Sequence, residues 1–390
     1  MPGTTKKKPH LLYIDCLRGY AILMVIACHL TYEFPDLPYP VKIVTTSGWF
    51  GVQLFFLASA VTLLMSWHSE AARGVLDVRA FFIRRFFRIA PAYYAAGILY
   101  FFAFPPEEFS VAQIARTATF VNALSPAWLT APDAWSVVPG GWSISVEFTF
   151  YLLFPIFATV VDSFRRSLLA LALCVGVGTG VNLAALAILS PHYPAATISN
   201  FLFFWFPNEA AVFALGGVVF FALRALQVRG DLHAVLARWS TALALVSILA
   251  FCTLAYLPLG HFMGDRPPIP AGQAVSLPLA GLVLALSANR SLLVSRPVAA
   301  MGKVSFSAYL LHFFVLEIFR AFPGTLHTQV PGVAAIAAYA VGFAVTVLLT
   351  FAASWVSYET IEAPMIRVGR RLIDAMQRGS ATPKPETGVL

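Results

Sequence analysis

The first apolar stretch, YIDCLRGYAILMVIACHL, contains an arginine and a histidine whose types and spacing suit proton-transfer chemistry. Arg18 and His29 lie three helical turns apart, so a helix places both on one face, about 16 Å apart along its axis. An imidazole has a pKa of about 6.5 in water and can take a proton from a hydroxyl group. His29 is therefore a candidate general base. The alternative is a hydrogen-bonded core histidine beside a structural Asp15–Arg18 pair.

Three arginines form a second candidate site, in FFIRRFFRIAPAYY. Their spacing predicts that Arg84, Arg85 and Arg88 lie on one face at the mouth of a helix. Guanidinium groups bind phosphate well because they donate paired hydrogen bonds. We expect this face to bind an anionic, phosphate-bearing ligand, or else to serve as a positively charged anchor at the membrane surface.

A third candidate is the segment Gly-Gly-Trp-Ser-Ile-Ser-Val-Glu, which contains Trp142, Ser143, Ser145 and Glu147. Glu147 is expected at the depth of His29, where it would orient the imidazole or contact substrate; a carboxylate favoured by the helix dipole is the alternative. The two serines and Trp142 are candidate substrate contacts. A Ser–His–acid arrangement is only weakly indicated, because the G-x-S-x-G motif is absent.

Tyr309 and His312, one turn apart in GKVSFSAYLLHFF, complete the set of candidate substrate contacts. A histidine on an apolar helix face is also a common core residue. No metal is expected, because the four cysteines lie in apolar stretches without the spacing of metal ligands.

The elements that must position these residues are membrane-spanning helices. Charged residues make up only 11% of the 390 residues, against about 25% in a soluble domain, while apolar residues make up 59%. This composition excludes disorder and argues against a soluble globule. The apolar stretches lack the alternation of a β-barrel, so we predict an all-α polytopic bundle of about ten transmembrane helices. The predicted spans are 11–31, 45–67, 86–104, 145–161, 168–188, 208–226, 240–258, 274–289, 304–321 and 332–355.

Most lysines and arginines fall on one side of these spans, which predicts that both termini are cytoplasmic. The net charge of +8 then reflects topology, and nucleic acid is not needed to explain it. We expect a basic N-terminus (1–10), a transmembrane domain (11–371) and a polar, disordered tail (372–390). The long loop 105–144 is expected to contain an interfacial helix at 111–121.

The motifs resemble those of the acyltransferase-3 family of membrane O-acyltransferases. The resemblance rests on the R-x10-H of Arg18 and His29, on GVQLFFLASA, on the R-x-x-R of Arg85 and Arg88, and on WSISVEFTFYLLFP, GKVSFSAYLLH and SYETIEAPMIR. These blocks follow the family's order from about residue 12 to 371. FFLASA differs from the family's usual F-F-x-L-S-G, since Ala60 replaces a glycine.

The resemblance implies a ten-helix enzyme of the bacterial cytoplasmic membrane. It would move an acyl group, most often acetyl, from cytoplasmic acyl-CoA to a hydroxyl of a glycan, lipid-linked sugar or other acceptor on the outer side. His29 and Arg18 match the family's essential residues, Arg85 and Arg88 its acyl-CoA pair, and Glu147 its fourth-span acid. No SGNH-type domain follows, so transfer is expected within the membrane domain or with a separate partner.

Two other classes remain as alternatives. A lipid or sugar transporter or flippase would line its pathway with the same polar residues, although no inverted repeat is visible. A membrane scaffold does not explain why Arg18 and His29 share a face. The acyl group, the acceptor, a covalent acyl-enzyme step and the oligomeric state stay open.

Overall fold

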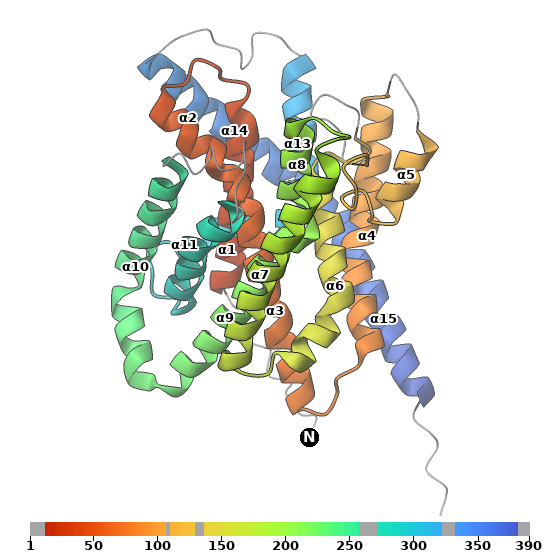
Figure 1. Ribbon diagram of the computed structural model, residues 1–390, viewed down its shortest axis with the longest axis vertical. Helices are drawn as coiled ribbons and strands as arrows, with labels where there is room; N and C mark the ends of the chain where they lie inside the picture. The colour runs from red at the N-terminus through yellow and green to blue at the C-terminus, as the bar shows by residue number, and fades with distance from the viewer. Residues whose placement is uncertain (1–11, 107–109, 129–135, 257–270, 322–331, 381–390) are drawn as a thin grey trace, which may run out of the picture.

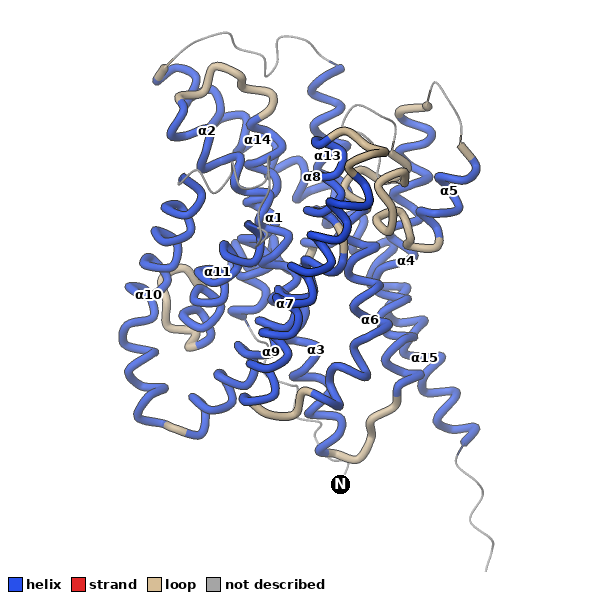
Figure 2. Tube along the Cα trace, viewed as in Figure 1, coloured by secondary structure: helices blue, strands red, loops and turns tan. Residues whose placement is uncertain are grey.

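The computed structural model describes residues 12–106, 110–128, 136–256, 271–321 and 332–380. Within these ranges the chain is a bundle of helices without a β-strand (Figures 1 and 2). The all-α fold predicted from the sequence is therefore confirmed. The α-helices are α1 (Leu12–Thr31), α2 (Tyr39–Thr46), α3 (Gly51–Ala72), α4 (Val78–Ala103), α5 (Val111–Ala118), α6 (Trp142–Val160), α7 (Phe164–Leu189), α8 (Ala195–Phe204), α9 (Phe206–Val228), α10 (Gly230–Tyr256), α11 (Ala271–Ser287), α12 (Arg296–Lys303), α13 (Ser305–Ala321), α14 (Val333–Ser357) and α15 (Ala363–Ser380).

Eight helical segments of the described chain are long and apolar enough to cross a membrane. The pair α12 and α13, bent by 81°, would add a ninth, and α11 is a shorter apolar helix. Each span predicted from the sequence coincides with a helix. These helices are α1, α3, α4, α6, α7, α9, α10, α11, α13 and α14. The number of crossings and the side on which the termini lie stay predictions.

Large apolar side chains are exposed along the outer helices α7 and α10. Examples are Leu168, Leu169, Leu173 and Val177 on α7, and Val235, Leu245, Val246 and Leu249 on α10. Water would disfavour such a surface, whereas lipid tails match it. The exposed surface therefore has the character of a polytopic membrane protein.

Helix α1 packs against α3, α12, α13 and α14. Two glycines allow α12 to lie directly against it. A methyl group at Gly302 would lie 1.7 Å from the carbonyl oxygen of Asp15, and one at Gly19 would lie 2.2 Å from that of Val298. Small residues let membrane helices approach closely. The close packing of α12 against α1 therefore fixes the position of α1, and with it Arg18 and His29.

The C-terminal segment corrects one prediction. Helix α15 continues to Ser380, so residues 372–380 are helical and not disordered. Its apolar side packs on α4, where Ile373 is buried and Gly369 lies against Phe87. The polar composition of this segment hid an amphipathic helix. Residues 381–390 and the basic N-terminus 1–10 lie outside the described residues. The predicted helix in the long loop is confirmed as α5.

Candidate active site

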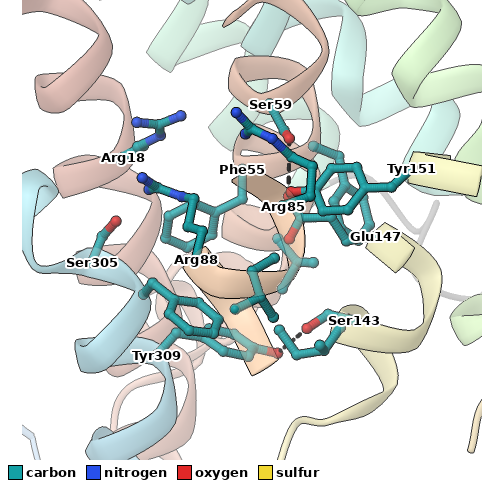
Figure 3. Close-up of a pocket in the computed structure, with 15 residues that line it drawn as sticks. Arg18, Phe55, Ser59, Arg85, Arg88, Ser143, Glu147, Tyr151, Ser305 and Tyr309 are labelled. Carbon is teal, nitrogen blue, oxygen red and sulfur yellow. Dashed lines mark hydrogen bonds between the residues drawn. The ribbon is translucent and has the colours of Figure 1, made fainter. Parts of the chain in front are cut away.

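A pocket opens among α1, α3, α4, α6 and α13, shown in Figure 3. Five helices, from three separate parts of the sequence, thus contribute to one site. The pocket is lined by Arg18, Val52, Phe55, Phe56, Ser59, Arg85, Arg88, Ile89, Ser143, Ile144, Glu147, Tyr151, Ser305, Phe306 and Tyr309. Six of the eleven candidates from the sequence are among them. The six are Arg18, Arg85, Arg88, Ser143, Glu147 and Tyr309.

Three guanidinium groups gather at one end of the pocket. Arg85 and Arg88 reach it from α4 and Arg18 from α1, as Figure 3 shows. Arg18 Nη2 donates to Thr62 Oγ1 at 3.3 Å. Arg85 lies 5.9 Å from the ring centre of Tyr151, and its Nε is buried without a hydrogen-bond partner among the described residues. Since a buried donor without an acceptor is costly, this end of the pocket is suited to an anionic ligand.

Arg84 departs from the expected group of three. Its Nη2 lies 2.8 Å from Glu70 Oε2 on α3, and it does not line the pocket. Successive helical residues differ in direction by about 100°, so Arg84 and Arg85 diverge even though both lie within reach of Arg88 on a helical wheel. The expectation that all three arginines face one ligand is thereby corrected.

Glu147 also lies in a different environment from the one expected. Its Oε1 accepts hydrogen bonds from Ser59 Oγ, at 2.9 Å, and from Tyr151 Oη. It shares the pocket with Arg85, and it makes no hydrogen bond to His29 in the described structure. Because α6 begins at Trp142, the second turn of the helix directs this carboxylate toward the arginines. The predicted partnership of Glu147 with His29 is therefore wrong.

His29 is instead paired with His312 of α13. The two rings approach with His29 Nδ1 3.2 Å from His312 Nε2, and Phe313 packs 4.3 Å from the His29 ring. His312 is fully buried, while His29 is partly exposed. Sequence reasoning selected both histidines but did not pair them. The predicted spans gave no signal for this pairing, because His29 lies near the end of 11–31 and His312 in the middle of 304–321.

Tyr309 connects the pocket with this pair. Its hydroxyl donates to Gly140 O at 3.0 Å and accepts from Ser143 Oγ at 2.9 Å, at the end of the pocket opposite the arginines (Figure 3). Its carbonyl oxygen lies 2.7 Å from His312 Nδ1. Ser143 is thus bound to a tyrosine, and the described structure places no serine against His29 as a catalytic triad requires.

Ser145 and Trp142, the other two candidates from the segment 142–147, do not line the pocket. Ser145 is buried and accepts a hydrogen bond from the backbone N–H of Ala123, at 3.4 Å. Trp142 packs against Phe204, with ring centres 4.4 Å apart. In this conformation both residues hold the loop and α8 against α6.

Two carboxylates have roles that the sequence did not indicate. Glu362 is buried in a π-helical turn between α14 and α15, accepts from Ser307 Oγ at 3.1 Å, and lies within electrostatic range of Arg88. The available signal was its place in SYETIEAPMIR, one of the blocks that resemble the acyltransferase-3 family. Glu33 is bound by Arg320, whose Nε lies 2.8 Å from its Oε1.

Comparison with known proteins adds independent findings. A family model described as an acyltransferase domain, acyltransferase 3, matches residues 11–355. Acyltransferase MdmB of Streptomyces mycarofaciens is 29% identical over 350 residues, which cover 81% of each chain. O-acetyltransferase OatA of Staphylococcus aureus is 23% identical over 376 residues, 91% of this chain and 57% of OatA. Peptidoglycan O-acetyltransferase OatA of Listeria monocytogenes is 27% identical over 195 residues, 46% of this chain and 29% of that protein. No solved structure matches.

Proposed function

Since the chain belongs to the acyltransferase-3 family and is a membrane acyltransferase, we propose how it transfers the acyl group. The donor is cytoplasmic acyl-CoA, and the acceptor is a hydroxyl group on the outer side of the membrane. His29 is the general base of this proposal. The observation that carries it is the arrangement of polar groups along α1. Arg18 shares a pocket with Arg85 and Arg88, and His29 lies about three turns farther along the same helix.

Support for the donor comes from the charge of the pocket. Acyl-CoA carries phosphate groups at one end and its thioester at the other, joined by a long pantetheine arm. Arg85 and Arg88 are placed to bind the phosphates. Arg18 of α1 adds a third positive charge to the same end of the pocket. The apolar side chains Phe55, Ile89 and Phe306 line the rest of the pocket and suit the uncharged arm.

The proposed chemical step uses the partly exposed imidazole of His29. Its unprotonated nitrogen takes the proton of the acceptor hydroxyl as the oxygen attacks the thioester carbonyl carbon. The carbon–sulfur bond then breaks, and the departing thiolate takes the proton from the imidazolium. Atoms and charge balance without a metal or a redox partner. Glu147 has no direct part in this step, and we assign it to the arginine pocket.

For the acceptor, the names of the relatives are the guide. Two of them are O-acetyltransferases, one of which acts on peptidoglycan by its name. We propose acetyl as the acyl group and a glycan or lipid-linked sugar as the acceptor. The protein would lie in the cytoplasmic membrane of a bacterium with both termini inside, which agrees with its basic loops.

The donor site is tested by acetyl-CoA binding to the purified protein in lipid nanodiscs, measured by calorimetry. Arg85→Ala and Arg88→Ala should each weaken binding about tenfold or more, because each removes charge-assisted hydrogen bonds. Arg84→Ala is the matched control and should leave binding within about twofold, since its partner is Glu70. Equal losses in all three variants would refute the assigned pocket.

The catalytic role is tested in cells with His29→Ala. Mass spectrometry of envelope glycans and lipids, with and without the gene, identifies the acyl group from the mass difference and the acceptor from its carrier. We expect the His29→Ala protein to insert normally and to bind acetyl-CoA, but to leave the acceptor unmodified. Normal transfer by a well-expressed His29→Ala protein would exclude the proposed base.

A further inference from the structure

The two paired histidines each have a ring nitrogen directed at a backbone carbonyl. His29 Nδ1 lies 3.0 Å from Val25 O, and His312 Nδ1 lies 2.7 Å from Tyr309 O. A carbonyl oxygen only accepts hydrogen bonds, so both contacts require a proton on Nδ1. The positions of the protons on this pair therefore follow from the geometry.

A neutral imidazole carries a proton on only one of its two ring nitrogens. With its proton on Nδ1, His312 presents a lone pair at Nε2, which lies 3.2 Å from His29 Nδ1. The N–H of His29 then faces two acceptors, Val25 O and His312 Nε2. The second nitrogen of His29, Nε2, carries the free lone pair, and no hydrogen bond to it occurs within the described residues.

The opposite tautomer of His29, with its proton on Nε2, requires a buried positive charge on His312. A lone pair on His29 Nδ1 would need a donor at His312 Nε2, and His312 would then be a cation with protons on both nitrogens. His312 is completely buried, and Phe313 packs 4.1 Å from its ring. Arg320, which is itself a cation, acts electrostatically on His29. Among the described residues, the hydrogen-bond partners of the His312 ring are Tyr309 O and His29, so a positive charge on His312 would lack a carboxylate partner there.

We infer that His312 is a positioning residue that holds His29 in the Nδ1–H tautomer and leaves Nε2 as the nitrogen that exchanges protons. His312 Nε2 also accepts a hydrogen bond from the imidazolium that forms when Nε2 takes the acceptor proton. In this enzyme a neutral histidine thus takes the orienting role that a carboxylate has in many hydrolases. The catalytic meaning of this inference rests on the proposed function, whereas the tautomer itself does not.

The tautomer is tested first, by nitrogen NMR of the protein in nanodiscs with ¹⁵N-labelled histidine at neutral pH. The signals of His29 are identified by their loss in His29→Asn. We expect Nδ1 to appear protonated and Nε2 unprotonated. A protonated Nε2 with a bare Nδ1 would overturn the inference, whether or not His29 proves essential for transfer.

The role of His312 is tested with two variants. His312→Phe keeps a ring but offers no acceptor, so only Val25 O still favours a proton on His29 Nδ1. We therefore expect a partial shift of His29 toward the other tautomer and a kcat about 10- to 100-fold lower. His312→Gln retains an oxygen that can accept from His29, and should restore a large part of both signals. Acetyl-CoA binding should stay within about twofold in both variants, because His312 does not line the pocket.

The outcomes separate the two proposals. Unchanged tautomer and kcat in His312→Phe would overturn the positioning role. Loss of acetyl-CoA binding in both variants would overturn it as well, by showing that His312 holds the fold. Transfer by His29→Ala would refute the proposed function, and would leave the tautomer of His29 as a structural fact only.

Discussion

The contact between α3 and α9 shows how helix packing supports the pocket, and a single methyl group tests it. A methyl group added at Gly216 would lie 2.6 Å from the side chain of Ala60. Carbon atoms in contact lie about 3.5–4.0 Å apart, so the helices would have to separate by about 1 Å. Ala60 is adjacent to Ser59, which donates to Glu147 in the pocket wall. The alanine that replaces the family's usual glycine is thus accommodated by a glycine on the facing helix.

The expected energies follow from this contact. Gly216→Ala adds overpacking of about 1–3 kcal/mol, offset by up to about 1 kcal/mol from better helix propensity. The free energy of unfolding therefore falls by up to about 3 kcal/mol. Ala60→Gly removes a buried methyl group, about 0.8 kcal/mol, and adds about 1 kcal/mol of propensity cost. The double variant moves the methyl group from one helix to the other, and should lie within about 1 kcal/mol of the natural protein.

The assay is thermal unfolding in nanodiscs, followed by tryptophan fluorescence, together with acetyl-CoA binding. We expect Gly216→Ala to melt at a lower temperature and to bind more weakly, and the double variant to recover both. Gly176→Ala is the matched control, because that helical glycine on α7 has no atom within 4 Å of an added methyl group. A Gly216→Ala protein as stable as the natural one, or a double variant no better than the sum of its parts, would refute the reasoning.

Two further predictions concern the ends of the pocket. Gly140→Ala should destabilise the protein by about 1–2 kcal/mol or more, because Gly140 has φ +74° and an added methyl group would lie 2.9 Å from Tyr309 Oη. Gly74→Ala, at φ +66° with nothing within 4 Å, should cost only the backbone part in the same melting assay. Glu362→Gln should tighten acetyl-CoA binding about two- to tenfold in calorimetry, because it removes a negative charge near the arginines while an amide can still bond Ser307. Unchanged affinity would show that this carboxylate does not act on the donor site.

The sequence predicted the helices well, and the physical reason is specific. A run of apolar residues long enough to cross lipid has few alternatives to a helix, because backbone polar groups must be satisfied within the segment. The same reasoning selected the candidate site residues. Arg18, His29 and Glu147 were chosen because charge inside an apolar stretch is costly.

The pairing of those side chains was harder to predict, because it depends on which helices become neighbours. A helical wheel gives directions relative to one axis, and says nothing of what lies opposite. Arg84 and Arg85 are adjacent in the chain, yet one binds Glu70 and the other lines the pocket. His29 was expected to meet a carboxylate, but α13 packs beside α1 and brings His312 instead.

The separation between the two halves of the site also bears on the kind of donor. Arg18 and His29 are about 16 Å apart along α1, and the hydrogen-bonded Tyr309 and Ser143 lie at the end of the pocket farthest from the arginines. A small acyl phosphate bound by the arginines would leave its acyl carbon near the phosphate, and so far from the imidazole. A donor with an anionic head and a long neutral arm satisfies both ends at once. The geometry thus supports our proposal that the donor bound by Arg85 and Arg88 is acyl-CoA and not a short acyl phosphate.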